Sequence, residues 1–358
     1  MKSINFIVYL VFISVFMTSC KDDDITVPNI EVRDRGEQQE ADSDSLIDYL
    51  SSHYYNSDFF LTGTNHKYSD IVITELAEGE DVPAGHTLLI DAVETHTTTY
   101  EETDYEYYVL RLNQGGGESP RFTDQVRVRY EGFLVETGVT FDGVVTPVDL
   151  LMQGVGFTGG VIRGWQLILP QFSTSIDFAF NNGIVEYNNY GLGMMFLPSG
   201  LAYFSGTASG TLSAYSNLIF KFELLQYEEV DHDGDGIPSY IEDFDANLDV
   251  LDDDTDEDLA PNYVDVDDDN DGVNTLDELM TMTYLEDNDM MPFSSEEDAQ
   301  DFYDNNAASN ELLVGIELNP ENSSYIINTL IMVDSDNNGT PDYLQEDISI
   351  NYNDEEEG

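Results

Sequence analysis

The sequence predicts an α+β chain in two unlike parts: an antiparallel sheet with a short helix in the middle, and an acidic module of metal-binding loops with little regular structure after it. Three observations lead to this prediction. Runs of β-branched and aromatic residues, separated by Gly-rich breaks, begin at Tyr105. After Tyr227 the composition changes abruptly to Asp, Asn and Gly. Within residues 231–278, Asp residues then recur at every second position in the spacing of calcium-binding loops.

The charge of the chain excludes one class of partner. Its 358 residues include 73 Asp and Glu against 11 Lys and Arg, a formal net charge of −62. A nucleic-acid-binding protein needs a basic surface to replace the counterions of the phosphates, so no nucleic-acid partner is expected. The last basic residue is Lys221. The acidic part that follows would repel itself unless it is unfolded or neutralised, and a hard divalent cation with oxygen ligands suits it best.

The N-terminus has the layout of an export signal. A basic Lys2 precedes an apolar run from Ile4 to Met17, and small residues lead to Cys20, the one cysteine of the chain. This arrangement resembles a bacterial lipobox, which implies a signal peptide over residues 1–19 and a lipid on Cys20 as the membrane anchor. The following "KDDD" resembles the acidic export tag of surface lipoproteins of Bacteroidetes. We therefore expect a bacterial envelope protein, anchored at the outer membrane and facing either the periplasm or the exterior.

Between the signal and the sheet, the sequence predicts a flexible tether and an ancillary segment. Residues 20–45 are polar and charged, as is typical of a tether. Leu46, Leu50 and Tyr54 share one stripe of a short helix over residues 46–56. The rest of the ancillary segment, which ends at residue 104, contains a possible strand at "HTLLIDAV".

The middle of the chain reads as an antiparallel sheet. In "QVRVRYEG", Val126, Val128 and Tyr130 share one face and the two arginines lie on the other; "LIFKFELL" alternates in the same way around Phe220. We expect one face of the sheet to be buried and the other to face water. The composition change places the end of this domain near residue 229.

Four blocks within residues 105–228 carry a specific resemblance. "VRVRYEGFLVETGVTFDG", "GGVIRGWQLIL", "FLPSGLAYF" and "NLIFKFELL" occur in the order and roughly the spacing of FKBP-type peptidyl-prolyl cis/trans isomerases. The resemblance covers about a third of the chain. It implies a bent antiparallel sheet wrapped around one short helix, with a shallow apolar pocket between them and no cofactor for catalysis.

The resemblance also implies which residues line the pocket. X-Pro bonds rotate over a barrier of about 18–20 kcal/mol because the planar amide must lose its resonance. An apolar site that favours the less dipolar, twisted amide lowers this barrier without covalent chemistry. Each aromatic alone is typical of core packing, whereas the set in this order predicts a pocket. The residues that match the family's pocket positions are Tyr130, Phe141, Asp142, Val161, Ile162, Trp165, Tyr203, Leu212 and Phe220.

Among these, Trp165 corresponds to the pocket floor, Ile162 to the residue whose backbone N–H binds a substrate carbonyl, and Tyr203 to the tyrosine whose hydroxyl reaches the ligand.

Several positions depart from the family. Val148 replaces an aromatic of the wall, and Ala208 stands where several members have His. No Arg follows Asp142 in "GVVTP", so we expect this carboxylate to be partly solvated or paired differently, because a buried unpaired carboxylate raises its own pKa. An insertion of about 15 residues lies around residues 173–191.

Four loops of the acidic module, residues 229–347, have the calcium-loop spacing. Alternate oxygens wrap the ion, Gly makes the sharp turn at position 6, the carbonyl of position 7 contributes, and the last carboxylate binds through both oxygens. Loops 231–242 and 267–278 are complete; loop 254–265 has Leu259 at the turn and loop 334–345 ends in Gln345. The predicted ligands are Asp231, Asp233, Asp235, Ile237, Ser239, Glu242, Asp254, Asp256, Asp258, Asn262, Asp265, Asp267, Asp269, Asp271, Thr275, Glu278, Asp334, Asp336, Asn338 and Asp342.

The recurrence of "IPSY", "APNY" and "TPDY" at one offset resembles thrombospondin type 3 calcium repeats. Calcium is thus expected as a structural ion that stiffens this module, the alternative being a solvated acidic tail. Residues 348–358 are expected to be a disordered tail.

Three functions are consistent with these patterns. The leading hypothesis is an envelope-anchored peptidyl-prolyl isomerase that acts on Pro-containing exported proteins. The first alternative is a chaperone-like lipoprotein that grips Pro-containing segments with little turnover and carries a calcium-stabilised spacer. The second makes the calcium repeats the main element, with the sheet domain as an adaptor.

Overall fold

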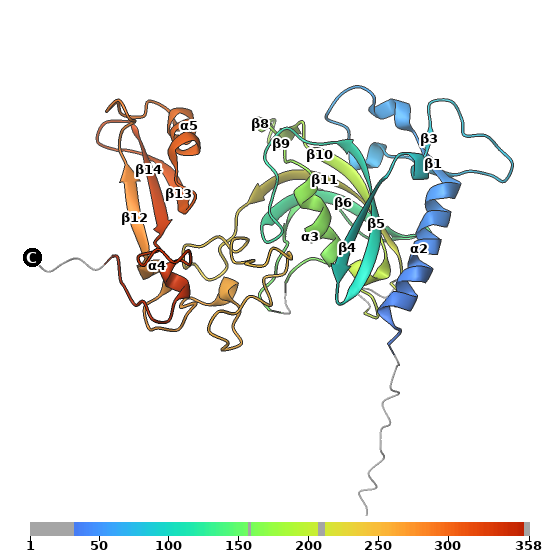
Figure 1. The fold of residues 1–358 in the computed structure, drawn as a ribbon. Helices are drawn as coiled ribbons and strands as arrows, with labels where there is room; N and C mark the ends of the chain where they lie inside the picture. The colour runs from blue at the N-terminus through green and yellow to red at the C-terminus, as the bar shows by residue number, and fades with distance from the viewer. Residues whose placement is uncertain (1–31, 157–158, 207–211, 354–358) are drawn as a thin grey trace, which may run out of the picture. The chain divides into compact units, whose positions relative to one another are not determined.

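The structure is a computed structural model that describes residues 32–156, 159–206 and 212–353 (Figure 1). The chain divides into two compact units, Met1–Asp34 and Arg35–Gly358, and every described helix and strand belongs to the second unit. The predicted signal with Cys20, and the departing residue Ala208, lie outside the described residues. None of the helices in the described ranges combines the length and the apolar composition needed to span a bilayer.

The largest sheet has six antiparallel strands in the order β4-β5-β10-β11-β6-β7. The strands are β4 (Glu94–Tyr100), β5 (Thr103–Asn113), β6 (Gln125–Leu134), β7 (Thr140–Leu151), β10 (Gly191–Leu197) and β11 (Leu218–Glu228). Helix α3 (Arg163–Ile168) connects β7 to the later strands and packs on one face of the sheet, with all six of its residues buried. The predicted antiparallel sheet with one short helix against it is therefore present.

The second face of this sheet is also buried, which corrects the expectation that it faces water. Residues that alternate with the α3-facing set, such as Tyr108, Met194 and Ile219, form a second cluster with Leu46 and Leu50. Strand β10 is buried at all seven positions. Its sequence, "GLGMMFL", is a continuous apolar run, which is typical of a strand covered on both faces.

The cover of that second face is helix α2 (Arg35–Ser52), together with a small sheet of β1 (His53–Tyr55), β2 (Ile73–Glu75) and β3 (Thr87–Leu88). The prediction of a tether up to residue 45 is thus wrong for residues 35–45, which are helical. The helix predicted over residues 46–56 begins eleven residues before residue 46 and ends at Ser52. Of the strand expected in "HTLLIDAV", two residues are extended, and a 3-10 helix, Leu89–Asp91, follows.

Two further boundaries shift. Strand β4 pairs along its whole length with β5, so the sheet domain begins at residue 94 and not at 105. The insertion forms a separate hairpin of β8 (Asp177–Asn181) and β9 (Ile184–Asn188). Every residue of β8 is exposed, including Phe178 and Phe180.

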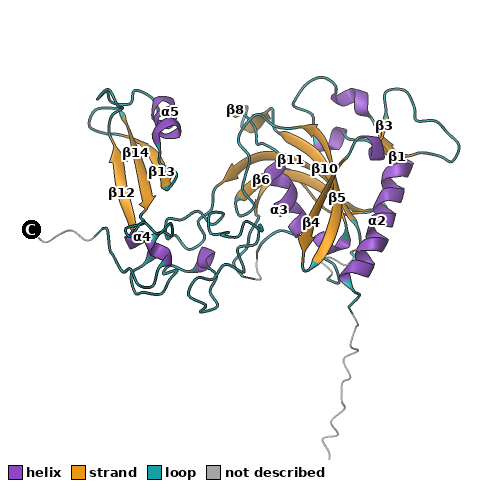
Figure 2. Ribbon diagram, in the orientation of Figure 1, coloured by secondary structure: helices purple, strands orange, loops and turns teal. Residues whose placement is uncertain are grey.

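The acidic module contains more regular structure than predicted. From β11 to α4 (Thr275–Glu278) it is loop almost throughout, as Figure 2 shows. A three-stranded antiparallel sheet of β12 (Leu279–Tyr284), β14 (Tyr325–Met332) and β13 (Glu311–Leu318) follows, with helix α5 (Glu296–Asn306). Ser295 caps α5 by accepting the N–H of Asp298. Apolar residues of these strands and α5 bury one another, which the abundance of Asp and Asn in the sequence obscures.

The predicted disordered tail is also partly ordered. The backbone N–H of Tyr352 donates to the carbonyl of Asp277 (2.8 Å), and its hydroxyl donates to Asp342 (2.6 Å). Residues 348–353 therefore belong to the module, and residues 354–358 lie outside the described part.

Candidate functional site

Four aromatic side chains from four different elements meet beneath the sheet. Tyr130 of β6, Phe141 of β7, Trp165 of α3 and Phe220 of β11 surround one another, with Phe220 in the middle. The ring centroid of Phe220 lies 5.1 Å from that of Trp165, 5.6 Å from Phe141 and 6.1 Å from Tyr130. Tilted and edge-to-face contacts of this kind stabilise aromatic clusters. They form a rigid apolar wall.

Two glycines permit this packing. A Cβ on Gly132 would lie 2.6 Å from the Phe220 ring and 3.0 Å from the Phe141 ring. A Cβ on Gly164 would lie 2.4 Å from a methyl carbon of Leu197 on β10. All three contacts are shorter than ordinary van der Waals packing. Glycine therefore brings β6 close to the aromatic wall and α3 close to the sheet.

The polar edge of the cluster is made by Tyr130, Asp142 and Tyr203. The Tyr130 hydroxyl donates to Oδ2 of Asp142 (2.8 Å), and the backbone N–H of Gly143 donates to Oδ1 (2.8 Å). Asp142 is exposed, so the carboxylate is both solvated and paired with a partner other than arginine, as the missing Arg led us to expect. Tyr203 packs against the same cluster, and burial, followed by the charge of Asp142, raises the pKa of its hydroxyl.

The aliphatic members of the predicted set join the same core. Leu212 is buried, and Val161 and Ile162 are half-buried against the cluster. Ile162 is the N-cap of α3 in an extended conformation, and its carbonyl accepts the N–H of Trp165 (3.0 Å). Its own N–H thus lies outside the helical hydrogen-bond pattern. The structure brings eight of the nine predicted pocket residues into one cluster, and the ninth, Asp142, is joined to it by the hydrogen bond from Tyr130. Val148 packs against the same cluster.

Helix α2 holds the segment that leads to Tyr203, a contribution that the sequence did not reveal. Asp42 of α2 accepts hydrogen bonds from the backbone N–H (2.9 Å) and hydroxyl (2.6 Å) of Ser199. Arg35 donates to the carbonyl of Gly200 (3.4 Å). These contacts fix the 3-10 helix Ser199–Leu201, two residues before Tyr203. The one available signal was the i, i+4 spacing of Gln38, Asp42, Leu46 and Leu50.

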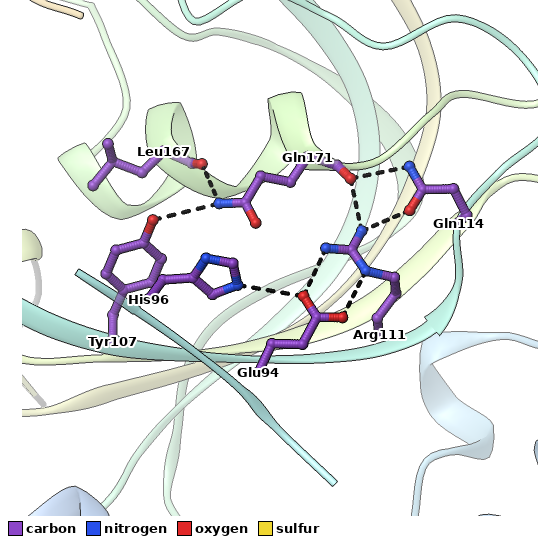
Figure 3. Close-up of polar contacts among 7 residues, drawn as sticks. All are labelled: Glu94, His96, Tyr107, Arg111, Gln114, Leu167 and Gln171. Atoms are coloured by element: carbon purple, nitrogen blue, oxygen red, sulfur yellow. Dashed lines mark hydrogen bonds and ion pairs between the residues drawn. The ribbon is translucent and has the colours of Figure 1, made fainter. Parts of the chain in front are cut away.

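A polar network holds the C-terminal end of α3 (Figure 3). The Arg111 guanidinium binds both oxygens of Glu94 (2.9 Å each) and donates to the carbonyl of Gln171 (2.6 Å). The Gln171 side chain in turn donates to the carbonyl of Leu167 (2.8 Å). The hydrogen bonds from Arg111 lower the pKa of Glu94. A cation at the C-terminal end of a helix satisfies its last carbonyls, so the network anchors Trp165 through α3.

The four acidic loops share one conformation. In each, the backbone N–H of position 9 donates to the carbonyl before the loop, and the side chain of position 9 accepts the N–H of position 2. The position-2 to position-9 contacts are His232–Ser239 (3.1 Å), Thr255–Asn262 (2.9 Å), Asp268–Thr275 (3.3 Å) and Ser335–Asp342 (2.9 Å). Position 6 has a positive φ in every loop, including Leu259 (φ 82°). Leu259 therefore does not break the turn.

This conformation changes the role of position 9. Ser239, Asn262, Thr275 and Asp342 are predicted metal ligands, but their side chains close the loop from inside. All four are almost completely buried. Loop closure is the role that the structure shows for position 9, and direct binding of an ion by these residues stays a prediction.

The carboxylates at positions 1, 3 and 5 converge in three of the loops. The clusters, each with oxygens within 4.8 Å of one another, are Asp231–Asp233–Asp235, Asp254–Asp256–Asp258 and Asp267–Asp269–Asp271. Within the described residues, one oxygen in most of these side chains, and both oxygens of Glu242 and Glu278, are buried without a hydrogen-bond partner. Unpartnered buried carboxylates are costly, so this donor set fits a hard cation that takes oxygen ligands.

The pKa values of these carboxylates are raised for the same reason, because burial disfavours their charged form. Burial, and after it the charges of neighbouring carboxylates, raises the pKa of Glu242 to about 11, of Asp235 to about 8 and of Glu278 to about 8. Asp265, the last residue of the second loop, also has a raised pKa, first from burial and then from Asp258 and Asp256. Of the end carboxylates, Glu242 lies with Asp235 of its own loop in one cluster of oxygens.

The fourth loop differs. The Asn338 amide donates to Asp336 (3.1 Å) and also to the side chain of Gln345, and the Gln345 amide donates to the carbonyl of Thr340 (2.9 Å). No described carboxylate oxygen of this loop is buried without a partner. Asp334, Asp336, Asn338 and Asp342 therefore form a loop closed by amide hydrogen bonds, and the structure does not gather them into a carboxylate cluster. The Ile237 side chain is buried in an apolar cluster beside the first loop.

Two groups of carboxylates were missed from the sequence. Asp243, Asp245 and Asp253 form a cluster between the first two loops, where an Asp-x-Asp pair was the available signal. Asp268 joins Asp235 and Glu242 from another loop, which the spacing within one loop does not reveal.

Comparison with known proteins finds a relative that is an enzyme and that matches part of this chain. Over 118 residues, the chain is 30% identical to the FKBP-type 22 kDa peptidyl-prolyl cis-trans isomerase of Escherichia coli strain K12. Part of this chain is similar to an FKBP-type isomerase. The match covers 32% of this chain and 47% of the relative, so the chain spans about half the length of the curated relative it matches.

Two solved structures and one family model also match. A peptidyl-prolyl cis-trans isomerase from Pseudomonas syringae pv. tomato strain DC3000 matches at a TM-score of 0.32 and 16% identity, over 55% of this chain and 98% of that one. FkpA from Escherichia coli matches at 0.28 and 25%, over 38% and 53% of the two chains. A family model described as BamM C-terminal matches residues 232–310, within the acidic module.

Proposed function

We propose that this chain is a peptidyl-prolyl cis/trans isomerase whose active site is the aromatic cluster around Phe220. The observation that carries the proposal is the convergence of Tyr130, Phe141, Trp165 and Phe220, with Asp142 and Tyr203 at their polar edge, in a chain that is 30% identical to an FKBP-type isomerase over 118 residues.

Isomerisation of an X-Pro bond requires an apolar surface that fits the substrate and only a few polar groups. Rotation about the X-Pro bond passes through a twisted amide that has lost its resonance and part of its dipole. In the proposed mechanism, the wall of Trp165, Phe141 and Phe220 holds the proline ring and excludes water. The N–H of Ile162 binds the substrate carbonyl, and the hydroxyl of Tyr203 orients the chain. Binding that is tighter for the twisted than for the planar amide lowers the barrier.

The test is a protease-coupled isomerisation assay on the full chain with an X-Pro peptide. Tyr203→Phe is expected to lower kcat/KM about tenfold or less, since it removes one hydrogen bond worth roughly 0.5–1.5 kcal/mol. Phe220→Ala is expected to lower it by more, because it opens the apolar wall. The matched control is Tyr227→Phe, which changes a tyrosine of β11 whose hydroxyl donates to Glu118 in the loop before β6.

The outcomes separate the candidate functions. Acceleration by the native chain that falls in the two pocket variants and not in the control supports the enzyme. Binding of the peptide without acceleration would favour the alternative, a Pro-segment-binding or chaperone-like protein. No acceleration and no binding by the native chain would contradict both.

We further infer that the acidic module binds structural calcium through the first three of its loops. The buried, unpartnered oxygens of Asp233, Glu242, Asp269 and Glu278 support this inference, and no Lys or Arg follows Lys221 in the sequence to neutralise them. A ligand that binds only the folded state raises stability by roughly 2.7 kcal/mol per site at 100 times its Kd. We expect calcium to raise the melting temperature of the chain and EDTA to lower it. Melting that is indifferent to calcium would contradict the assignment.

Location and clients complete the proposal. A lipid on Cys20 anchors the chain to the bacterial envelope, where Pro-containing exported proteins are its clients. Metabolic labelling with an alkyne fatty acid tests the anchor. Native chain is expected to incorporate the label and Cys20→Ser to lose it; unlabelled native chain would refute lipidation.

A further inference from the structure

Three carboxylates from two different loops meet in the interior of the acidic module. Asp235 and Glu242 belong to loop 231–242, and Asp268 belongs to loop 267–278. Their oxygens lie within 4.8 Å of one another. The three residues are 2%, 1% and 2% exposed, respectively. Both oxygens of Glu242, both of Asp268 and Oδ2 of Asp235 are buried without a hydrogen-bond partner in the described structure.

The backbone of the third loop explains why Asp268 faces another loop. Asp267, Asp269 and Asp271 turn their carboxylates toward the cluster of their own loop. Asp268 lies between two of them at position 2, and its backbone N–H is held by Thr275 (3.3 Å). Its side chain is therefore directed away from its own ion site. The other loops have His232, Thr255 and Ser335 at this position, so Asp268 is the one acidic residue among the four.

The charge of the group cannot be balanced by the protein. The ion pairs of the described residues involve none of these three carboxylates. Several buried carboxylates without a cation are strongly unfavourable, whereas a metal ion supplies both the charge and the missing partners for their oxygens. An all-protein cage of carboxylates suits Ca²⁺ better than Mg²⁺, which keeps several waters and demands octahedral geometry.

We propose that Asp235, Glu242 and Asp268 hold a calcium ion that joins loop 231–242 to loop 267–278. The proposal rests on the calcium binding inferred above and adds a ligand and a site that the spacing within a loop does not provide. Asp235 also belongs to the Asp231–Asp233 cluster, so this ion couples the first loop to the third. Calcium then acts as a cross-link between loops that are separate in the sequence, and not only as the filling of single loops.

The experiment compares the full chain with Asp268→Asn, which keeps the shape of the side chain and removes its charge. Asp277→Asn is the matched control, because Asp277 lies in the same loop, makes the same charge change and belongs to none of the carboxylate clusters. Each protein is freed of metal with EDTA, titrated with CaCl₂ by isothermal calorimetry, and melted with EDTA and with calcium.

Two opposite effects are expected of Asp268→Asn. Without metal it should melt above the native chain, because one charge of the buried cluster is gone. With calcium, at least one binding constant should weaken tenfold or more and the rise in melting temperature should shrink. Asp277→Asn should behave as the native chain in both conditions.

The contrary results are distinct. Native chain that binds calcium while Asp268→Asn titrates and melts as Asp277→Asn does would overturn the cross-loop ion and leave the loop sites standing. Native chain that binds no calcium would overturn both proposals. A second readout is terbium luminescence sensitised by Tyr343, which packs in one apolar cluster with Ile237, two residues after Asp235. Asp268→Asn should reduce this emission, and unchanged emission at saturating terbium counts against the site.

Discussion

Trp165 shows how a single residue changes meaning with its neighbours. Its side chain is 4% exposed and touches Tyr130, Phe220 and Phe222, which by itself describes a core tryptophan. What makes it the floor of a proposed pocket is the polar edge formed by Asp142 and Tyr203 beside the same cluster. Because it is the one tryptophan in the sequence, its fluorescence also reports the unfolding of the sheet domain.

The closeness of Gly132 to the aromatic wall leads to a stability prediction. Gly132→Ala places a Cβ 2.6 Å from the Phe220 ring, so the wall must shift, and overpacking of this kind costs about 1–3 kcal/mol. Urea unfolding followed by Trp165 fluorescence measures the loss. The control is Gly315→Ala, where a Cβ meets nothing within 4 Å. Equal stability of Gly132→Ala and the native chain would show that the wall yields freely.

Asp124 leads to a prediction for pH. It is fully buried before β6, accepts the N–H of Arg121 (2.6 Å), and burial raises its pKa from 3.8 to about 6. A carboxyl whose pKa is raised on folding stabilises the fold at low pH, and this contribution is lost as the pH rises from about 4 through 6. In saturating calcium, the native chain should lose more stability over this range than Asp124→Asn. Parallel curves for the two proteins, by Trp165 fluorescence, would exclude the effect.

At the scale of elements, α2 is the component that completes the sheet domain. Its buried stripe is Gln38, Asp42, Leu46 and Leu50, spaced four residues apart. The apolar half covers the second face of the sheet, and Asp42 holds the segment before Tyr203. A helix that covers one face of a sheet and also positions a pocket residue links the stability of the domain to its site.

The two sides of α2 differ enough to test this role. Leu46→Ala should cost about 2–5 kcal/mol, because Leu46 is fully buried in the second cluster. Ile47→Ala, one residue further and 40% exposed, should cost much less. Urea unfolding by Trp165 fluorescence measures both. Losses of the same size would mean that α2 does not pack as described.

At the scale of the whole molecule, the acidic module contacts the loop that leads to the pocket. Tyr263 accepts the N–H of Gly156 (3.0 Å) and donates to the carbonyl of Gly154 (3.0 Å). Arg163, beside the predicted Val161–Ile162 pair, donates to the carbonyl of Leu248 (2.5 Å). Gly154, Gly156 and Arg163 are therefore held by residues of the module, and loops stiffened by calcium should hold them more firmly.

This contact predicts that calcium supports the proposed isomerase activity. Tyr263→Phe removes two hydrogen bonds, so kcat/KM in calcium should fall about fivefold. EDTA should lower the native activity to a similar extent and the variant's by less. Tyr343→Phe, a buried tyrosine of the module whose hydroxyl faces the Met332 sulfur at 4.0 Å, should leave activity unchanged. If EDTA leaves the native activity unchanged, calcium binding by the module does not support the pocket.

The sequence by itself identified what depends on order and spacing along the chain. Eight of the nine pocket residues, all but Leu212, fall in four blocks that follow in a fixed order, and the loop carboxylates fall at alternate positions of a short segment. Both patterns can therefore be recognised from the sequence. The strands β6 and β11 followed from alternation. Each of these features is local because a strand or a loop fixes the direction of its own side chains.

The tertiary structure alone decided what depends on partners far away in the chain. The polar half of the α2 stripe was predicted to be a tether because Ser199, the hydrogen-bond partner of Asp42, lies 157 residues later in the sequence. The burial of the second face could be seen only once α2 was packed on it. The strand β4 could be recognised only from its pairing with β5. Asp268 read as a spacer between ligands because the carboxylates that it meets lie in another loop. Buried polar groups are tolerated only where the fold supplies their partners, and sequence spacing does not contain that information.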